Sequence, residues 1–268
     1  MSSVTALLPA WQAAEFIQPT LDCLSAQTYP NLEVIVSVDL SDDDTAEICD
    51  THARRHRGFR VIRQSQRLGY VGNCNALLNL ASSDYALFAF HDDVLAPDYV
   101  AALVAVLDAR PEVVVSFSDV HLTHVNGKQV HCEFGALNGV RDRVTRGKVM
   151  LNGGHKWWVP NRGLFRLDRV RRIQGLKTHG AGEFSADLPW LFHMSLLGEF
   201  ARVPRTLCNK YYKPGSLSRT WAYSREQLFE VRSACAREIW NSELSTEEKL
   251  DLALPLTNWL MKNRPSST

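Results

Sequence analysis

The chain has 268 residues, of which 45% are hydrophobic and 22% charged, and this composition is typical of a folded globular protein. Lys and Arg outnumber Asp and Glu by 30 − 29 = 1. This net charge is too small to favour binding to nucleic acid or to an anionic membrane. The longest apolar run, residues 99–107, is far shorter than the roughly 20 residues of a membrane-spanning helix. We therefore expect no nucleic-acid partner and no integral membrane segment.

The first 120 residues alternate short apolar runs with apolar residues at helical spacing. Repeated βαβ units of this kind predict an α/β fold with a doubly wound, mainly parallel sheet and helices on both faces. Ligands of such sheets bind beyond the carboxyl ends of the strands, where the polar segments 9–11, 39–44 and 91–93 fall. The predicted strands are 4–8, 32–38, 60–63, 85–90 and 113–117, and the predicted helices lie near 17–24, 44–56, 72–81 and 97–107.

Residues 119–183 break this pattern, because glycines recur and no period is sustained. The segment contains several large aromatic residues, which a linker would not need. We interpret it as loops and short strands packed over the edge of the sheet.

Helical periodicity returns at 187–197 and continues to the end of the chain. Ser224-x-x-Gln227 and Ser245-x-x-Glu248 have the pattern of capping boxes, which predicts that two C-terminal helices start there. The chain is therefore divided into three parts, residues 1–120, 121–222 and 223–268, of which the last is a helical extension.

Two adjacent carboxylates end an apolar strand at His91-Asp92-Asp93. Such a pair is costly to bury unless it is neutralised. Mg²⁺ or Mn²⁺ could neutralise it, since these ions take one or two protein carboxylates and complete their shell with phosphate oxygens and water. The simpler interpretation is that Asp92 or Asp93 caps the helix that follows.

Asp39 directly follows the second predicted strand and could accept a hydrogen bond from a base N–H or a ribose hydroxyl. The alternative is a solvated loop whose acids cap the next helix. We prefer this alternative for residues 42–44, and leave both open for Asp39.

Several segments occur in an order that resembles family 2 glycosyltransferases of the GT-A fold. In the first 110 residues they are 4–11, 24–36, Asp39-x-Ser-x-Asp-x-Thr45, 68–75 and 84–99. Residues 183–190 and 198–204 resemble the catalytic segment of that family, and residues 213–218 resemble its closing basic stretch. The resemblance implies that a sugar passes from a nucleotide-sugar to an acceptor hydroxyl with inversion at the anomeric carbon.

The resemblance also implies roles for residues on the donor side, in a half formed by residues 1–120. It implies that Asp93 holds Mg²⁺ or Mn²⁺, although His91 replaces the acidic residue that many members carry at the start of this triplet. The nucleotide-sugar ligands it implies are Pro9, Ala10 and Trp11 as a loop under the nucleotide, Asp39 at the base, commonly uracil, Arg67 near the diphosphate or base, Asp92 at the ribose or sugar, and Lys213 at the diphosphate.

By the same resemblance, Asp187 matches the general base, which must take the proton of the attacking hydroxyl. From the residues alone, Asp187 could instead be a helix N-cap. Glu183 is an acceptor ligand or the second choice of base. The glycine-rich segment 175–182 before it is either a mobile lid or an ordinary loop, and the sequence does not separate these two interpretations.

Trp157, Trp158, Asn161 and Arg162 are the acceptor candidates in the half formed by residues 121–222. Indole faces stack on the C–H surfaces of sugars, and the amide and guanidinium groups could bind hydroxyls or an anionic group. The alternative, which we expect to hold for at least one tryptophan, is burial in the core. His121-x-x-His124 has no third ligand at a useful spacing and is interpreted as structural.

We therefore expect a cytoplasmic, metal-dependent, inverting glycosyltransferase of bacterial surface glycan or glycoconjugate synthesis. The six cysteines form no C-x-x-C pair, in keeping with reduced thiols. We expect the protein to bind a nucleotide-sugar, for which the resemblance to the family implies UDP as the usual carrier, and a glycan or glycolipid acceptor. The sequence leaves open whether it contacts a membrane surface peripherally. A sugar nucleotidyltransferase is disfavoured because residues 9–15 lack Gly, Lys and Arg, and a binding protein that has lost turnover is the other alternative.

Overall fold

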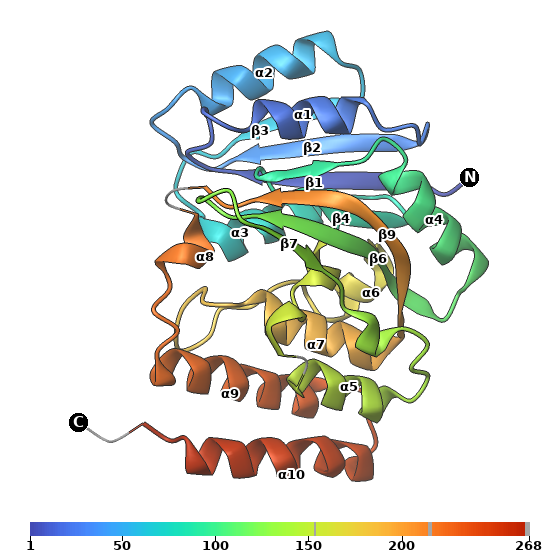
Figure 1. The fold of residues 1–268 in the computed structure, drawn as a ribbon, viewed down its shortest axis with the longest axis vertical. Helices are drawn as coiled ribbons and strands as arrows, with labels where there is room; N and C mark the ends of the chain where they lie inside the picture. Colours follow the sequence, from blue (N-terminus) through green and yellow to red (C-terminus); the bar gives the residue numbers. More distant parts are fainter. Residues whose placement is uncertain (153, 214–215, 266–268) are drawn as a thin grey trace.

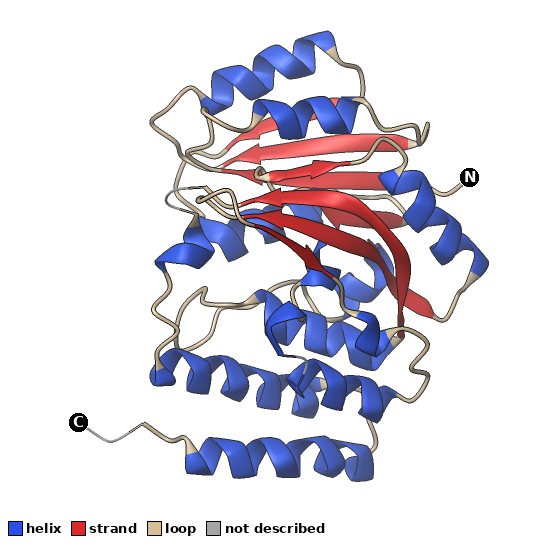
Figure 2. Cartoon of the chain, viewed as in Figure 1, coloured by secondary structure: helices blue, strands red, loops and turns tan. Residues whose placement is uncertain are grey.

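The computed structural model describes residues 1–152, 154–213 and 216–265, without the side chain of residue 155. In this part of the chain nine strands form one sheet in the order β3-β2-β1-β4-β8-β6-β9-β5, with β7 paired to β6 (Figures 1 and 2). The strands are β1 (Val4–Ala10), β2 (Leu32–Val38), β3 (Phe59–Arg63), β4 (Tyr85–Phe88), β5 (Asp93–Leu95), β6 (Val113–Thr123), β7 (Gln129–Cys132), β8 (Leu164–Arg166) and β9 (Glu199–Tyr211).

The sheet is mainly parallel, as the sequence predicts. β1, β2, β3 and β4 run in one direction, and β6 and β9 run parallel to each other. β8 lies antiparallel between β4 and β6, and β5 and β7 are antiparallel to β9 and β6. All seven residues of β1 are buried, as expected of a central strand that is covered on both faces.

Helices cover the sheet, and further helices lie beside it on one side (Figure 1). No helix of the described residues has the length and apolarity that a membrane span requires. The helices are α1 (Gln18–Ser25), α2 (Thr45–Arg55), α3 (Gly69–Leu80), α4 (Tyr99–Ala109), α5 (Arg143–Asn152), α6 (Leu167–Arg172), α7 (Asp187–Leu197), α8 (Leu217–Thr220), α9 (Arg225–Asn241) and α10 (Thr246–Lys262), with short 3-10 turns η1 (Gly135–Leu137), η2 (Gly154–Lys156) and η3 (Val159–Arg162).

The C-terminal helices start where the sequence predicts. Ser224 and Ser245 each accept a hydrogen bond from the backbone N–H three residues later, and the Gln227 and Glu248 side chains return one to the cap. α5, α7, α9 and α10 pack together as a helical layer beside the sheet (Figure 1). This layer buries one side of α7, which carries Asp187 at its first position.

The interpretation of residues 119–183 as an edge of loops and short strands is wrong in two respects. β8 lies inside the sheet, between β4 and β6, and α5 is a regular helix. Gly147 concealed α5 in the sequence, because glycine weakens a helical pattern. In the structure a Cβ at Gly147 would lie 3.0 Å from the side chains of Leu196 and Leu252, so glycine allows α5 to pack closely on α7 and α10.

Candidate functional site

The carboxyl ends of β1 and β2 lie side by side, since Ala10 pairs with Val38. The expected loop of residues 9–11 starts later than predicted: Pro9 and Ala10 are the last residues of β1, and only Trp11 enters the loop. Pro9 fits the strand because β4 pairs with β1 only as far as Leu7, so its missing N–H removes no ladder hydrogen bond there.

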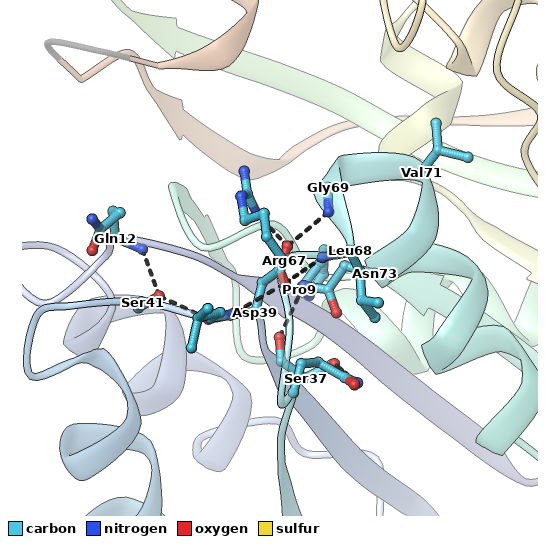
Figure 3. Close-up of polar contacts among 12 residues, drawn as sticks. Pro9, Gln12, Ser37, Asp39, Ser41, Arg67, Leu68, Gly69, Val71 and Asn73 are labelled. Atoms are coloured by element: carbon cyan, nitrogen blue, oxygen red, sulfur yellow. Dashed lines mark hydrogen bonds and ion pairs between the residues drawn. The ribbon is translucent and has the colours of Figure 1, made fainter.

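Asp39 is fully buried at the end of β2, and its carboxylate binds the start of α3 (Figure 3). It accepts hydrogen bonds from the backbone N–H groups of Leu68 at 2.7 Å and Gly69 at 2.9 Å, and from the guanidinium group of Arg67. A carboxylate is favourable at a helix N-terminus, where the backbone N–H groups lack partners within the helix. Asp39 therefore fixes the Arg67–Gly69 turn as well as the Arg67 side chain.

Arg67 and Trp11 form a partly exposed platform beside Asp39. The guanidinium carbon lies 3.8 Å from the centroid of the Trp11 ring, which is a cation–π contact. The Trp11 side chain is 39% exposed, an unusual degree for a large aromatic residue next to a buried strand. The pair offers a flat, positively charged surface at the carboxyl edge of the sheet.

Asp92 and Asp93 are neutralised by two cations that come from other parts of the chain. Lys210 donates to Asp92 Oδ2 at 2.9 Å and lies 3.8 Å from Asp93 Oδ1. The Arg162 Nε donates to Asp93 Oδ2 at 3.1 Å. The simpler interpretation of these acids as caps of the next helix is wrong, because the N-cap of α4 is Asp98 and Asp93 lies in β5.

The pKa values of the two acids move in opposite directions. Burial raises the pKa of Asp93 more than the charges of Arg162 and Lys210 lower it, so its net pKa is raised. Burial also acts on Asp92, but the charges of Lys210, His91 and Arg162 outweigh it and the net pKa of Asp92 is lowered. Asp92 is thus the more firmly ionised acid.

Asp187 lies at the start of α7, next to the residues of η3. Its Oδ2 accepts a hydrogen bond from Asn161 Nδ2 at 2.9 Å, and the next residue of the chain, Arg162, binds Asp93. Burial raises the pKa of Asp187 to about 6, against the opposing charge of Arg162. The N-cap of α7 is Ala186, so the N-cap interpretation of Asp187 is wrong. A carboxylate with such a pKa is suited to take a proton near neutral pH.

Asp93 also has a feature that fits a bound cation. Its Oδ1 is buried and has no hydrogen-bond partner among the described residues. The Nδ1 of His91 lies 3.1 Å from the carbonyl oxygen of Pro9. The residues fit a divalent cation held by a single carboxylate together with ligand phosphates, which is a common arrangement for Mg²⁺. Arg162 and Lys210 would have to share Asp93 with it.

A second group of potential metal ligands lies elsewhere on the sheet. Asp119, His131 and Glu133 each place one ligand atom within 4.8 Å of the others. Arg202 already binds both carboxylates, with Asp119 held in a two-pronged contact at 2.7 and 2.8 Å. An ion there would have to displace this arginine, so the group fits a metal less well than Asp93 does.

Glu183 binds the start of α3. Its Oε1 accepts a hydrogen bond from the N–H of Val71 at 2.8 Å, in the first turn of α3. Segment 175–182 before it is anchored: the Asn75 side chain binds both the N–H and the carbonyl of Leu176, and Lys177 binds Glu238 at 3.0 Å. These contacts are those of a packed loop.

The remaining predicted residues divide between the site and the core. Trp157 and Trp158 both pack against the hydrophobic core, and Trp158 also lies 5.0 Å from the Arg162 guanidinium. Lys213 lies over the ring of Phe16, at 5.6 Å, and Phe16 contacts His91. Lys213 thus reaches the same edge as the acids; residues 214 and 215 of the predicted basic stretch lie outside the described residues.

Lys210 is the functional residue that sequence reasoning missed. It lies opposite Asp93 in the β5–β9 pairing, and that pairing joins segments more than 110 residues apart. The signal in the sequence is weak: a lysine between Asn209 and two tyrosines at a strand end. Four aromatic or basic residues close to this strand end were also not grouped together, namely Tyr212, Arg219, Trp221 and Tyr223.

Comparison with known proteins gives a family and a fold. Residues 5–166 match the model of glycosyl transferase family 2. Amylovoran biosynthesis glycosyltransferase AmsB of Erwinia amylovora is 33% identical over 93 residues, which are 34% of this chain and 31% of that protein. The chain spans about a third or less of the curated relatives it matches first.

Two solved structures share the architecture. Staphylococcus aureus TarS (residues 1–349) in complex with UDP-GlcNAc has a TM-score of 0.75 at 17% identity, over 96% of this chain and 72% of that one. The mannosyltransferase PcManGT of Pyrobaculum calidifontis, in complex with GDP-Man and Mn²⁺, has a TM-score of 0.64 at 19% identity, over 97% and 70%. These likenesses confirm the expected GT-A-like fold.

Proposed function

The chain belongs to glycosyl transferase family 2, and from this premise we propose that it transfers a sugar from a nucleotide-diphosphate sugar to an acceptor hydroxyl, with inversion. One observation carries the proposal: the consecutive residues Asn161 and Arg162 bind Asp187, which is buried and has a pKa of about 6, and Asp93 of the acid pair. A proton acceptor and a charged donor site therefore lie in one contact network at the carboxyl edge of the sheet.

On the donor side, we place the nucleobase on the platform of Trp11 and Arg67. The exposed indole and the guanidinium above it suit a flat aromatic ring that carries acceptor oxygens. Asp39 then acts through Arg67 and the turn before α3, because its own oxygens are already bonded within the protein. We propose UDP as the carrier, with support from the UDP-GlcNAc complex of TarS.

On the acceptor side, Asp187 takes the proton of the attacking hydroxyl. Its pKa of about 6 leaves it mostly ionised at neutral pH and still basic enough to accept a proton in the transition state. The hydrogen bond from Asn161 holds the carboxylate in place. The inverting course follows from this arrangement, since a base that activates the acceptor directly needs no covalent intermediate.

We propose that Asp93 binds Mg²⁺ or Mn²⁺, because its Oδ1 is buried without a partner among the described residues. The Mn²⁺ complex of PcManGT supports this assignment. When bound, the ion supplies positive charge to the leaving diphosphate. Lys210, Arg162 and Lys213 bring further positive charge to the same edge.

The acceptor we propose is a glycan or glycolipid of a bacterial surface polysaccharide, made in the cytoplasm. AmsB, of amylovoran biosynthesis, and an abequosyltransferase of Salmonella typhimurium, 32% identical over 110 residues, support this context. The assignment of residues 1–120 to the donor, 121–222 to the acceptor and base, and 223–268 to a helical extension is part of the same proposal.

Thermal unfolding with a panel of nucleoside diphosphates, with and without Mn²⁺, tests the proposed function. A ligand that binds only the native state stabilises it by about 2.7 kcal/mol at a hundredfold excess over Kd. We expect UDP to raise the melting temperature, more strongly with Mn²⁺, and this rise to shrink in Trp11→Ala. If no nucleoside diphosphate changes the melting temperature, the proposal is wrong.

A further inference from the structure

A small cavity is lined in part by Tyr212, whose ring contacts Lys210 of the candidate site. It has a volume of about 270 Å³ and is lined by the β6–β7 turn, at residues 124–126, together with Tyr212 and Arg219. This volume approaches the lower end of the range for small-molecule sites. Nothing in the proposed donor site uses this cavity.

Tyr212 connects the cavity to the reaction centre. Lys210 lies 5.3 Å from the centre of the Tyr212 ring and at the same time binds Asp92 at 2.9 Å. The Arg219 guanidinium lies 5.4 Å from the same ring, and the His124 ring lies 5.5 Å from it. Tyr212 therefore contacts both the cavity and the lysine that binds Asp92.

The charge of the cavity favours an anion. Arg219 lines it, His124 adds a group that can become positive, and none of the described lining residues is acidic. A guanidinium group binds phosphate or carboxylate in a two-pronged geometry, which gives specificity as well as affinity.

An exposed aromatic surface continues from Arg219 along the chain. Trp221 and Tyr223 pack edge to face on the buried Phe184, at 5.2 and 5.3 Å, and Phe184 lies three residues before Asp187. Tyr223 is nevertheless 53% exposed, and its φ of 52° is a strained conformation for a bulky residue. The Tyr223 hydroxyl donates a hydrogen bond to the carbonyl oxygen of Ser218 at 3.4 Å, which holds the ring beside the chain that carries Arg219.

We propose that Tyr212, Arg219, Trp221 and Tyr223 form the acceptor site, with a sugar ring on the exposed face of Tyr223 and an anionic group of that sugar, phosphate or carboxylate, on Arg219. The inference rests on the proposed function and specifies its acceptor as an anionic sugar. It moves the aromatic contact from Trp157 and Trp158, which pack on the core and on Arg162, to residues next to Asp187.

Sugar binding in the presence of UDP, measured by saturation-transfer NMR, tests this inference. The probes are the 6-phosphates of glucose, galactose and mannose, glucuronic acid, the matching neutral methyl glycosides, and inorganic phosphate. We expect at least one anionic sugar to bind the wild-type protein about tenfold more tightly than its neutral counterpart and than inorganic phosphate. Glucuronic acid and the sugar phosphates distinguish a carboxylate acceptor from a phosphate acceptor.

Two variants test whether Arg219 and Tyr223 bind the sugar. Arg219→Gln should remove the advantage of the anionic sugars, and Tyr223→Asn should weaken binding of the preferred sugar about tenfold. Asparagine tolerates a positive φ, so this change removes the ring without adding backbone strain. The controls are Arg60→Gln, on the outer strand β3, and Trp240→Leu, which is as exposed as Tyr223 at 53%.

Equal binding of anionic and neutral sugars, no sugar binding at all, or wild-type affinity in both variants would overturn the inference. UDP binding is recorded in the same samples. Failure of UDP and of every other nucleoside diphosphate to bind contradicts the proposed function itself, whereas nucleotide binding without the sugar preference contradicts only the acceptor site.

Discussion

Lys210 lies opposite Asp93 in the β5–β9 pairing, and its ammonium group binds the neighbouring Asp92 at 2.9 Å. Both side chains are nearly buried, at 7% and 12% exposure. A buried carboxylate without a counter-charge is strongly unfavourable. The acid pair is therefore neutralised by a residue of β9, a strand more than 110 residues away in the chain. The free energy of unfolding of a Lys210 variant measures how much this contact stabilises the protein.

Lys210→Met should destabilise the protein by about 3 kcal/mol, because it leaves Asp92 buried without its main partner. The double variant with Asp92→Asn should recover much of this loss. Urea unfolding measures both values. The control is Lys148→Met, whose partner Asp251 is exposed, and its cost should stay below about 1 kcal/mol. Equal costs for the two lysines would contradict the account.

Gly69→Ala should destabilise the protein more than Gly127→Ala. Both glycines have a positive φ, of 76° and 80°, so both substitutions carry a backbone cost of about 1 kcal/mol or more. Only at Gly69 would the new Cβ meet another group, Glu183 Oε1 at 2.6 Å; at Gly127 nothing lies within 4 Å. The difference between the two free energies of unfolding isolates the clash with Glu183, and no difference would show that this carboxylate moves freely.

Part of the fold could be predicted from the sequence. The βαβ order of the first 120 residues, the capping boxes at Ser224 and Ser245 and the GT-A-like fold were all predictable, because they depend on local periodicity and on motif order. The insertion of β8 between β4 and β6 was not, because three residues carry no period and their partners lie far apart in the chain.

The candidate site was predictable to a similar degree. Motif order singled out Asp92, Asp93 and Asp187. In the structure the consecutive residues Asn161 and Arg162 bind Asp187 and Asp93. That Arg162 would bind Asp93, and that Glu183 would bind the N–H of Val71, depends on tertiary contacts. Such contacts have no signature in one sequence, since each partner alone looks like an ordinary charged residue.

The pH dependence of stability should carry the signature of Asp187. Burial raises the pKa of its folded state to about 6, above the ordinary value of 3.8. The folded state therefore binds the proton more tightly than the unfolded state, and the stability this gives is present below about pH 4 and lost as the pH rises to about 6. Asp187→Asn should remove this slope and be more stable than wild type at pH 7, by about 3 kcal/mol. Parallel pH profiles of wild type and variant in urea unfolding would contradict the raised pKa.

Trp11→Ala should weaken UDP binding about tenfold, which corresponds to about 1.4 kcal/mol. Its effect on the free energy of unfolding should be small, because the side chain is 39% exposed. Isothermal titration with UDP measures the affinity, and Trp240→Ala provides an exposed tryptophan on α9 as the control. An unchanged affinity for UDP would remove the Trp11 and Arg67 platform from the donor site.

The most direct test of the central claim is release of UDP from UDP-sugars by wild type and Asp187→Asn, followed with a panel of sugar acceptors. The account predicts that an acceptor increases the rate at which the wild-type protein releases UDP. It also predicts that Asp187→Asn binds UDP with unchanged affinity but loses a factor of about 10² to 10⁴ in kcat. Wild-type turnover in Asp187→Asn would contradict the role of Asp187 as the base that activates the acceptor.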